Sequence, residues 1–201
     1  MTEFRLSIIT IAHDNYVELV ETLNSIDNQK IPPFENILIL SGFSELDKEK
    51  IISDYSSSFR HFYWNIDNSL FNAMNIGIKK SNGSYLLFLN AGDYFLDKQR
   101  TYAIKNFLKP NKCLSFKTYQ IYKNISIIRE NQSPEKVFSF RRVQNLPPHQ
   151  GFIAPNEKKI MYNELLKVSA DNDWMIKNIN KYGINYSDEI LANFKLGGQS
   201  T

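Results

Sequence analysis

An amide and a carboxylate, Asn90 and Asp93, follow an apolar run, with two small residues between them. The run from Tyr85 to Leu89 consists of large apolar residues, which is typical of a strand buried on both faces. The small residues Ala91 and Gly92 allow the backbone to approach a ligand closely. A carboxylate at such a strand end can hold a divalent cation, and it is equally typical of a turn or helix cap. The residues themselves leave both interpretations of Asp93 open.

Three earlier segments have the same organisation, an apolar run that ends in polar residues. The predicted strands span residues 6–12, 37–40, 61–64 and 84–89, and the predicted helices span residues 16–26, 47–56 and 70–80. This alternation indicates a parallel sheet built from right-handed crossovers, whose ligands bind beyond the carboxyl ends of the strands. The polar residues at those ends are His13 and Asp14, Ser41, Asp67, and Asn90 with Asp93. We expect them to meet in one cleft.

The alternation of strands and helices is lost in the second half of the chain. Residues 114–122 and 125–129 predict a hairpin, residues 132–148 are polar and irregular, residues 151–154 predict a strand, and residues 171–182 predict a helix. A long loop inside a compact domain is more often functional than idle. We therefore expect this half to cover the cleft and to receive a second substrate.

The composition is that of a globular protein of 201 residues with enough apolar side chains for one sizeable core. Basic residues exceed acidic ones by 24 to 21, but they occur in separate pairs rather than in a stripe, which argues against nucleic-acid binding. Cys113 is the only cysteine, so a reducing compartment, the cytoplasm, is expected. We expect no signal peptide and no membrane-spanning helix, and the sequence leaves the oligomeric state open.

Six segments, in order along nearly the whole chain, resemble family 2 glycosyltransferases of the GT-A fold. They are similar to the bacterial branch that builds O-antigen, capsule and colanic-acid-like polysaccharides. The segments are residues 7–29, 67–78, 88–93, 149–150, 167–173 and 196–198. They resemble the family's opening strand and helix, its D-x-G-I-Y-D-A-M-N-x-G-I segment, its metal-binding D-x-D motif, the start of H-Q-x-x-F, the K-I-A-A-D-Y-D segment and L-G-G. Each is weak alone, and their order is what makes the resemblance specific.

The resemblance implies an α/β protein with the GT-A fold, a Rossmann-like, mostly parallel sheet with helices on both faces and a smaller acceptor-side region. Residues 1–201 would form one domain, in which residues 1–111 bind the nucleotide sugar and residues 112–201 bind the acceptor and carry the catalytic residues. The implied activity is inverting transfer of a hexosyl unit, from a nucleotide sugar that is expected to be a UDP-sugar. The implied acceptor is a glycan or a lipid-diphosphate-linked saccharide.

The resemblance also implies a cofactor and a location. Mn²⁺ or Mg²⁺ would meet the charge of the departing diphosphate, since both ions prefer oxygen ligands. Surface polysaccharide synthesis would take place at the inner face of the cell membrane. Because the chain ends soon after Gly197 and Gly198, a C-terminal membrane-associating segment is expected beyond residue 201.

The resemblance assigns roles to individual carboxylates. Asp93 is the expected metal ligand, and Asn90 is expected to shape its turn. Asp171 is the expected base that removes the proton of the incoming hydroxyl, and Asp173 would orient it. The alternative for Asp171 is that it caps the helix that it begins.

Other residues are expected to surround the two substrates. His149 has two interpretations, a loop histidine that satisfies backbone groups or a group near the acceptor or diphosphate. Trp174 is expected either in the core or stacked on a sugar face. The residues expected to bind the nucleotide sugar are His13, Asp14, Ser41, Asp67, Asn75 and Asn90.

The chain departs from the family pattern at several positions. Ser41 stands where the family has an Asp that reads the nucleobase or ribose, and Asn72 stands where it has an acidic residue. Ser69 replaces Gly and Phe71 replaces Tyr. These departures motivate an alternative function, a catalytically silent domain that binds a nucleotide sugar or a partner enzyme. A nucleotidyltransferase is disfavoured because the first loop lacks a Gly-rich, Lys/Arg-bearing segment.

Overall fold

One sheet of nine strands runs through the part of the chain that the computed structural model describes, residues 4–64, 69–123, 125–130, 146–166 and 168–196. The strand order is β3-β2-β1-β4-β8-β6-β9-β5, and β7 pairs with β6. The strands are β1 (Leu6–His13), β2 (Glu35–Ser41), β3 (Arg60–Trp64), β4 (Tyr85–Phe88), β5 (Tyr94–Phe95), β6 (Cys113–Tyr122), β7 (Ile125–Arg129), β8 (Phe152–Pro155) and β9 (Ile184–Lys195). The helices are α1 (Tyr16–Asp27), α2 (Glu45–Tyr55), α3 (Leu70–Lys80), α4 (Arg100–Phe107), α6 (Ala170–Tyr182) and the short 3-10 helix η2 (His149–Gly151).

The first four strands confirm the parallel sheet that the sequence predicts. β1 lies between β2 and β4, β3 lies outside β2, and all three pairings are parallel. The side chains from Leu86 to Phe88 are at most 1% exposed, as expected for a strand covered on both faces. Asn15, Ser44 and Ser69 cap α1, α2 and α3, because each side chain accepts a hydrogen bond from the backbone N–H three residues later.

The second half of the sheet is mixed. β8 runs antiparallel to β4 and β6, whereas β9 runs parallel to β6. The predicted hairpin is confirmed as β6 and β7. The strand predicted from Gly151 begins one residue later, because Gly151 closes η2 by donating to the Pro148 carbonyl at 3.0 Å. The sequence analysis missed α4, β5 and β9, since β5 has two residues and polar side chains interrupt the pattern of β9.

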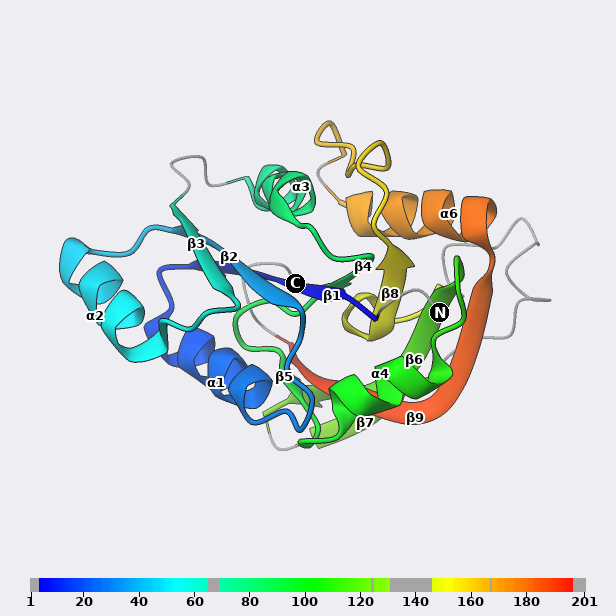
Figure 1. Ribbon diagram of the computed structural model, residues 1–201, viewed down its shortest axis with the longest axis horizontal. Helices are drawn as coiled ribbons and strands as arrows, with labels where there is room; N and C mark the ends of the chain where they lie inside the picture. Colours follow the sequence, from blue (N-terminus) through cyan, green and yellow to red (C-terminus); the bar gives the residue numbers. More distant parts are fainter. Residues whose placement is uncertain (1–3, 65–68, 124, 131–145, 167, 197–201) are drawn as a thin grey trace.

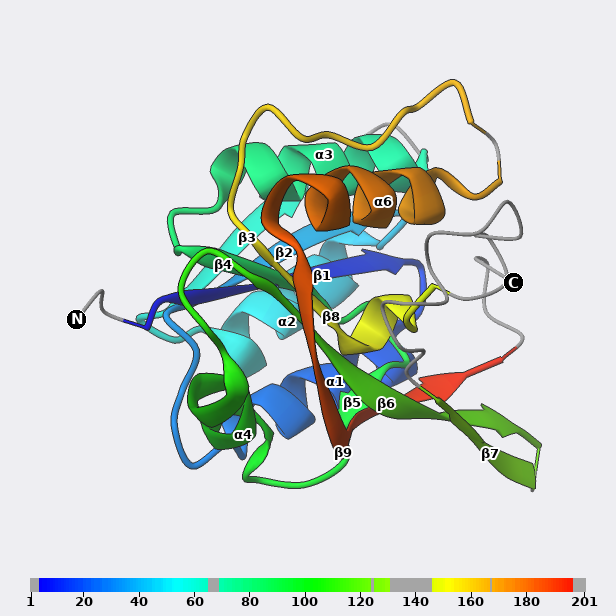
Figure 2. The same ribbon diagram turned by 90° about the vertical axis from the view of Figure 1, so that its right-hand side faces the viewer.

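Helices cover both faces of the sheet (Figures 1 and 2). On one face α3 packs on β1 and α6 on β8 and β6, and both helices share a buried cluster with Ile9 and Ile11; on the other face α1 and α4 share a buried cluster with Ile8. Helix α3 comes very close, since a Cβ on Gly77 would lie 2.4 Å from the Ile9 side chain. None of the helices in the described residues is long and apolar enough to cross a membrane.

A buried carboxylate joins the amino ends of three parallel strands. Glu35, whose side chain is 3% exposed, accepts hydrogen bonds from the Ser7 hydroxyl at 2.6 Å and from the backbone N–H groups of Asn82 and Gly83. Burial raises the pKa of Glu35, but these hydrogen bonds outweigh it and hold the pKa below the ordinary value of 4.5. Glu35 therefore stays ionised and stabilises the sheet at the end away from Asp93.

Replacing this carboxylate should make stability less dependent on pH. Because the folded-state pKa is lowered, the contribution of Glu35 is present above about pH 4.5 and is lost as the pH falls through the lowered value. We expect Glu35→Gln to lower the free energy of unfolding by about 1–3 kcal/mol at neutral pH. Urea denaturation of both proteins at neutral pH and at about pH 3 measures this.

The matched control is Glu45→Gln, which removes an exposed carboxylate paired with Lys48 at 2.5 Å. This control should change stability little at either pH, since exposed ion pairs contribute little. A loss of equal size at both pH values in Glu35→Gln would contradict the role given to the ionised carboxylate.

Candidate functional site

A cavity of about 710 Å³ lies between the end of β4 and the start of α6. Its wall comes from both halves of the chain, including α3, the β6–β7 hairpin and the residues around η2. The polar side chains of this wall include Asn90, Arg129, His149, Gln150, Glu164 and Asp171. The strand ends predicted to form a cleft therefore contribute Asn90, and the second half contributes most of the remaining groups.

Asp93 ends the turn that follows β4. Its backbone N–H donates to the Asn90 carbonyl at 2.9 Å, and Gly92 has φ +91°, a conformation that glycine adopts without strain. A side chain on Gly92 would also meet the Glu18 carboxyl at 3.3 Å. The small residues noted in the sequence thus let the turn fold closely against α1.

The hydroxyl of Thr22, on α1, holds this turn in place. It lies 2.7 Å from the Asp93 carbonyl and 3.2 Å from the Asn90 carbonyl, and the Gly92 N–H donates to it at 3.0 Å. One turn further along α1, Ser25 accepts from the backbone of β5. The turn is therefore fixed by polar side chains of a helix, although it has no regular structure of its own.

The Asp93 carboxyl lies just behind the cavity wall. The residue is 4% exposed, and its side chain is hydrogen bonded to Gln150, which lines the cavity. Burial raises the pKa of Asp93 well above its ordinary value of 3.8; the Asn90 backbone and Gln150 lower it, and the negative charge of Glu18 adds to the rise. A cation beside Asp93 would favour its ionised form.

The oxygen atoms at this turn fit a hard divalent cation. The Asn90 Oδ1 is buried and has no hydrogen-bond partner among the described residues, and Asn90 lines the cavity. Within the described ranges, no group of three or more His, Cys, Asp or Glu side chains could hold a metal ion. Mg²⁺ needs only one or two protein carboxylates when phosphates complete its ligands. Asp93 and Asn90 are the residues that would hold such an ion.

His149 belongs to a buried aromatic group. Its Nε2 lies 2.7 Å from the Tyr162 hydroxyl, and its ring stacks on Phe88 with centroids 5.4 Å apart. Burial lowers the pKa of His149, and the Asp171 carboxylate opposes this. Burial, and then Asp171, raise the pKa of Tyr162. His149 lines the cavity and its ring is hydrogen bonded to the Tyr162 side chain. The interpretation of His149 as a loop residue that only satisfies backbone groups is therefore not supported.

Asp171 lies in the first turn of α6 and lines the cavity. Ser169, with φ +68°, occupies the N-cap position of α6, and the Asp171 Oδ1 accepts from the Asn172 N–H in the first turn at 2.8 Å. Asp171 is therefore not the N-cap residue, although its carboxylate satisfies one N–H group of the first turn. Its electrostatic effect on His149 and Tyr162 shows that the three side chains lie close together.

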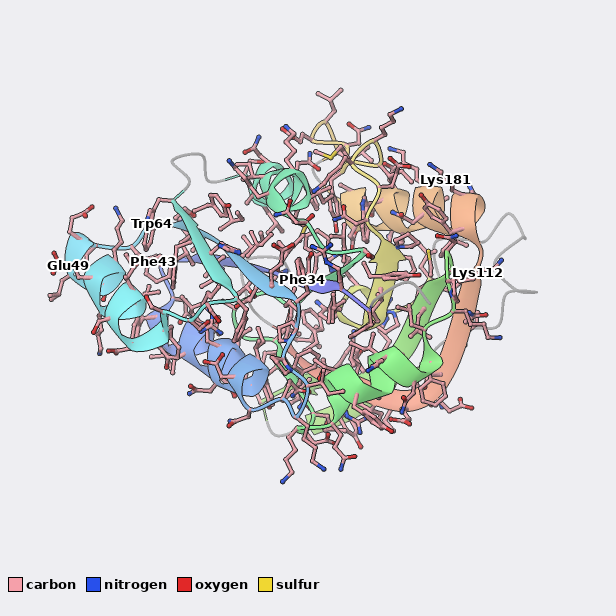
Figure 3. The ribbon with its side chains drawn as sticks, in the orientation of Figure 1. Phe34, Phe43, Glu49, Trp64, Lys112 and Lys181 are labelled. Atoms are coloured by element: carbon pink, nitrogen blue, oxygen red, sulfur yellow. The ribbon has the colours of Figure 1, made fainter. Side chains whose placement is uncertain are left out.

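Two further predictions about α6 have different outcomes. Asp173 does not line the cavity, and its carboxylate pairs with Lys177 at 2.6 Å, one helical turn before Lys181, which Figure 3 labels near the end of α6. A role in orienting Asp171 stays a prediction. The sugar-stacking interpretation of Trp174 is wrong, because Trp174 is 1% exposed and its Nε1 donates to the Ile160 carbonyl.

The predicted nucleotide residues of the first loop lie beside the turn of Asp93. The Ala91 N–H donates to the Ile11 carbonyl at 2.9 Å, two residues before His13. The His13 Nδ1 lies 2.9 Å from the Ser41 hydroxyl, and the Asp14 N–H donates to the Ser41 carbonyl. These three residues come together but do not line the cavity, and Asp67 lies outside the described residues.

Asn75 is buried, and its side chain is hydrogen bonded to other residues of the protein. It is 3% exposed, its Oδ1 accepts from the Tyr162 N–H, and its Nδ2 donates to the Tyr162 carbonyl and to Glu164. These bonds tie α3 to the segment before α6. The predicted contact of Asn75 with the nucleotide sugar is thus replaced by contacts within the protein.

Sequence reasoning missed four residues that shape the site: Thr22, Gln150, Tyr162 and Glu164. Gln150 follows His149 in a recognised motif, so that motif could have indicated it. The others act through contacts between distant segments, and no local pattern marks them.

Loss of the Thr22 hydroxyl should disturb the turn of Asp93. Thr22→Val keeps the shape of the side chain but leaves buried backbone groups unpaired, so we expect a loss of about 1–3 kcal/mol in stability and weaker Mn²⁺ binding by calorimetry. Thr101→Val is the matched control, since Thr101 is buried and donates to the Ile31 carbonyl at 2.6 Å. Equal effects of the two variants on Mn²⁺ affinity would contradict the role of Thr22.

Solved structures share this architecture. Staphylococcus aureus TarS is similar with a TM-score of 0.74 and 18% identity, over 98% of this chain and 37% of TarS. TarS 1–349 in complex with UDP gives 0.75 and 18%, over 96% and 60%. The mannosyltransferase PcManGT from Pyrobaculum calidifontis, in complex with GDP-Man and Mn²⁺, gives 0.68 and 12%, over 97% and 58%. The expected GT-A fold, with helices on both faces of a curled sheet, is confirmed by this likeness.

Sequence comparisons agree with the structural ones. An uncharacterized glycosyltransferase of Methanocaldococcus jannaschii is 25% identical over 89% of this chain and 66% of its own length. One from Rickettsia bellii is 28% identical over 60% of this chain and 17% of its own length, so the chain spans only part of each relative. The model of the family described as Glycosyl transferase family 2 matches residues 7–165. This match covers most of the sequence, and the chain therefore belongs to glycosyl transferase family 2.

Proposed function

We propose that this protein is an inverting glycosyltransferase that moves a hexosyl unit from a nucleotide sugar to a hydroxyl group of a saccharide acceptor. The observation that carries the proposal is the Asp171 carboxylate, which lines the cavity in the first turn of α6. The turn of Asn90 and Asp93 supplies oxygen atoms to the same region. This transfer needs a base that removes the proton of the acceptor hydroxyl, and it needs a site that binds the departing diphosphate.

The proposed reaction is a single displacement. The acceptor oxygen forms a bond to the anomeric carbon, the bond from that carbon to the diphosphate oxygen breaks, and the hydroxyl proton goes to Asp171. His149 and Tyr162 hold the buried wall beside Asp171, so water is excluded from that side. Mg²⁺ or Mn²⁺, when bound by Asp93 and Asn90, supplies positive charge for the departing diphosphate.

The donor is proposed to be a UDP-sugar. TarS 1–349 has been solved with UDP and with UDP-GlcNAc, and PcManGT with GDP-Man and Mn²⁺, so proteins of this fold bind nucleotide sugars and one binds Mn²⁺. In this chain the His13–Ser41 pair lies beside the Asp93 turn, where we propose that the nucleoside binds. Asp67, outside the described residues, is proposed to bind it too.

The acceptor is proposed to be a glycan or a lipid-diphosphate-linked saccharide of bacterial surface polysaccharide synthesis, of the O-antigen or capsule type. Support comes from Val168, which lines the cavity and is 79% exposed, and from Leu165, which is 91% exposed and precedes the lining residue Leu166. Such exposed apolar side chains suit an acceptor carried at the inner face of a membrane. In this scheme residues 1–111 bind the donor and residues 112–201 bind the acceptor.

The direct test is a donor screen. The protein is incubated with UDP- and GDP-sugars, Mn²⁺ and candidate acceptors, and released nucleotide and product mass are measured. We expect turnover, and we expect Asp171→Asn to lower kcat by about a hundredfold or more, as for loss of a general base. Asp93→Ala should abolish the stimulation by Mn²⁺.

The matched control is Asp47→Asn, which changes an acidic residue in the first turn of α2 and should retain activity. Circular dichroism and thermal unfolding establish that each variant is folded. Normal turnover in folded Asp171→Asn would remove that residue as the base. Binding of UDP without turnover of any donor would favour the silent, ligand-binding domain instead.

A further inference from the structure

Glu164 is a carboxylate at the cavity wall that the proposed reaction does not use. It lies in a turn before α6, where the Leu165 N–H donates to the Asn163 side chain and the Leu166 N–H to the Asn163 carbonyl. The residue is exposed, and yet its carboxylate is held in a defined position.

Two amides from consecutive turns of α3 hold Glu164. The Asn75 Nδ2 donates to Oε1 at 2.7 Å, and the Asn72 Nδ2 donates to Oε2 at 3.3 Å. Both the Nδ2 and the Oδ1 of Asn75 are in turn hydrogen bonded to the backbone of Tyr162. The carboxylate is therefore attached to α3, the helix that packs most closely on β1.

This arrangement keeps Glu164 charged and able to bind more. The hydrogen bonds from Asn75 and Asn72, with the positive charge of Lys79, hold the pKa of Glu164 below its ordinary value. Each carboxylate oxygen has two lone pairs, and each of these oxygens accepts one of the amide hydrogen bonds. Among the described residues, each oxygen therefore keeps a lone pair for a ligand in the cavity.

An aromatic ring lines the same cavity as this carboxylate. Phe71, adjacent to Asn72, lines the cavity and stacks on Tyr162 with centroids 5.9 Å apart. A ring that offers an apolar face beside a fixed acceptor of hydrogen bonds suits a ligand with both C–H surfaces and hydroxyl groups. A sugar has this chemistry.

We propose that Glu164 accepts hydrogen bonds from the hydroxyl groups of a sugar unit bound in the cavity, and that it helps to determine which sugar is accepted. The inference rests on the proposed function and deepens it. The sugar is either the donor hexosyl unit or the acceptor saccharide, and the experiment below distinguishes the two.

The inference also explains the amide at position 72. Asn72 stands where the sequence pattern has an acidic residue, and a carboxylate there would face Glu164 at about the present 3.3 Å. Two carboxylates at that distance repel each other, whereas the amide donates a hydrogen bond. In this chain the negative charge at this wall lies on Glu164, in the segment before α6, and Asn72 on α3 donates a hydrogen bond to it.

The test separates sugar binding from nucleotide binding. Calorimetry with UDP and with a UDP-sugar, both with Mn²⁺, is combined with the KM of the acceptor for wild type and Glu164→Gln. We expect the affinity for UDP to be unchanged. If Glu164 binds the donor sugar, the affinity for the UDP-sugar should fall about tenfold, since the hydrogen bonds involve a charged group. If it binds the acceptor sugar, the KM of the acceptor should rise about tenfold for the same reason. Asn72→Asp should give a similar loss.

The double variant Asn72→Asp with Glu164→Gln exchanges amide and carboxylate and should recover part of the lost affinity. The matched control is Glu157→Gln, since Glu157 lies outside the cavity and pairs with Lys181 at 2.6 Å. It should leave all three constants unchanged.

A purely structural Glu164 would lower thermal stability without a sugar-dependent loss, and that result would overturn the inference. A wild-type protein that binds UDP-sugars but turns none over would defeat the proposed transfer. In that case the calorimetric comparison decides the inference: a loss of UDP-sugar affinity in Glu164→Gln would support it, and an unchanged affinity would overturn it. A wild-type protein that binds no nucleotide sugar would overturn both.

Discussion

The packing of one ring, that of Phe88, connects the parallel sheet to the wall of the cavity that includes His149. Phe88 is the last residue of β4, and its ring contacts His149, Tyr162 and Trp174 at centroid distances of 5.3–5.4 Å. These three side chains come from segments far along the chain from β4. Aromatic rings with such contacts allow little rearrangement in a close-packed interior. The positions of His149 and of the start of α6 therefore depend on where β4 ends.

The two ends of the parallel strands use buried carboxylates differently. At the amino ends, Glu35 receives several hydrogen bonds and its pKa is lowered, so its charge is satisfied within the protein. At the carboxyl end, burial raises the pKa of Asp93 and the Asn90 Oδ1 has no partner in the described residues. A satisfied group stabilises the fold, whereas an unsatisfied one favours a ligand that completes it. The contrast separates the structural end of the sheet from the functional one.

Local patterns in the sequence predicted the elements that their own residues determine. The apolar run before Asn90 identified β4, and the spacing of apolar residues identified α1 and α3 with nearly their observed bounds. Asn90, at the end of β4, followed from those patterns, whereas the family resemblance suggested His149 and Asp171, and all three line the cavity. Local patterns could not indicate Thr22 or Glu164, because a threonine inside a helix and a glutamate in a loop are ordinary until a distant segment meets them. Asn75 and Trp174 were misjudged for the same reason, since tertiary contacts use their polar atoms.

The place of β4 in the sheet has a consequence for the order in which the protein folds. The strands β1, β2 and β3 pair with strands that lie close by along the chain, whereas the pairings of Leu6 with Tyr85 and of Tyr85 with Pro155 join segments far apart in sequence. Closing a long loop is entropically costly, so distant pairings form late. The sheet of β1 to β3 can thus assemble first, and the cavity is completed only when β4, β8 and the α6 segment dock. An intermediate that lacks this docking would contain three strands of the sheet and no cavity.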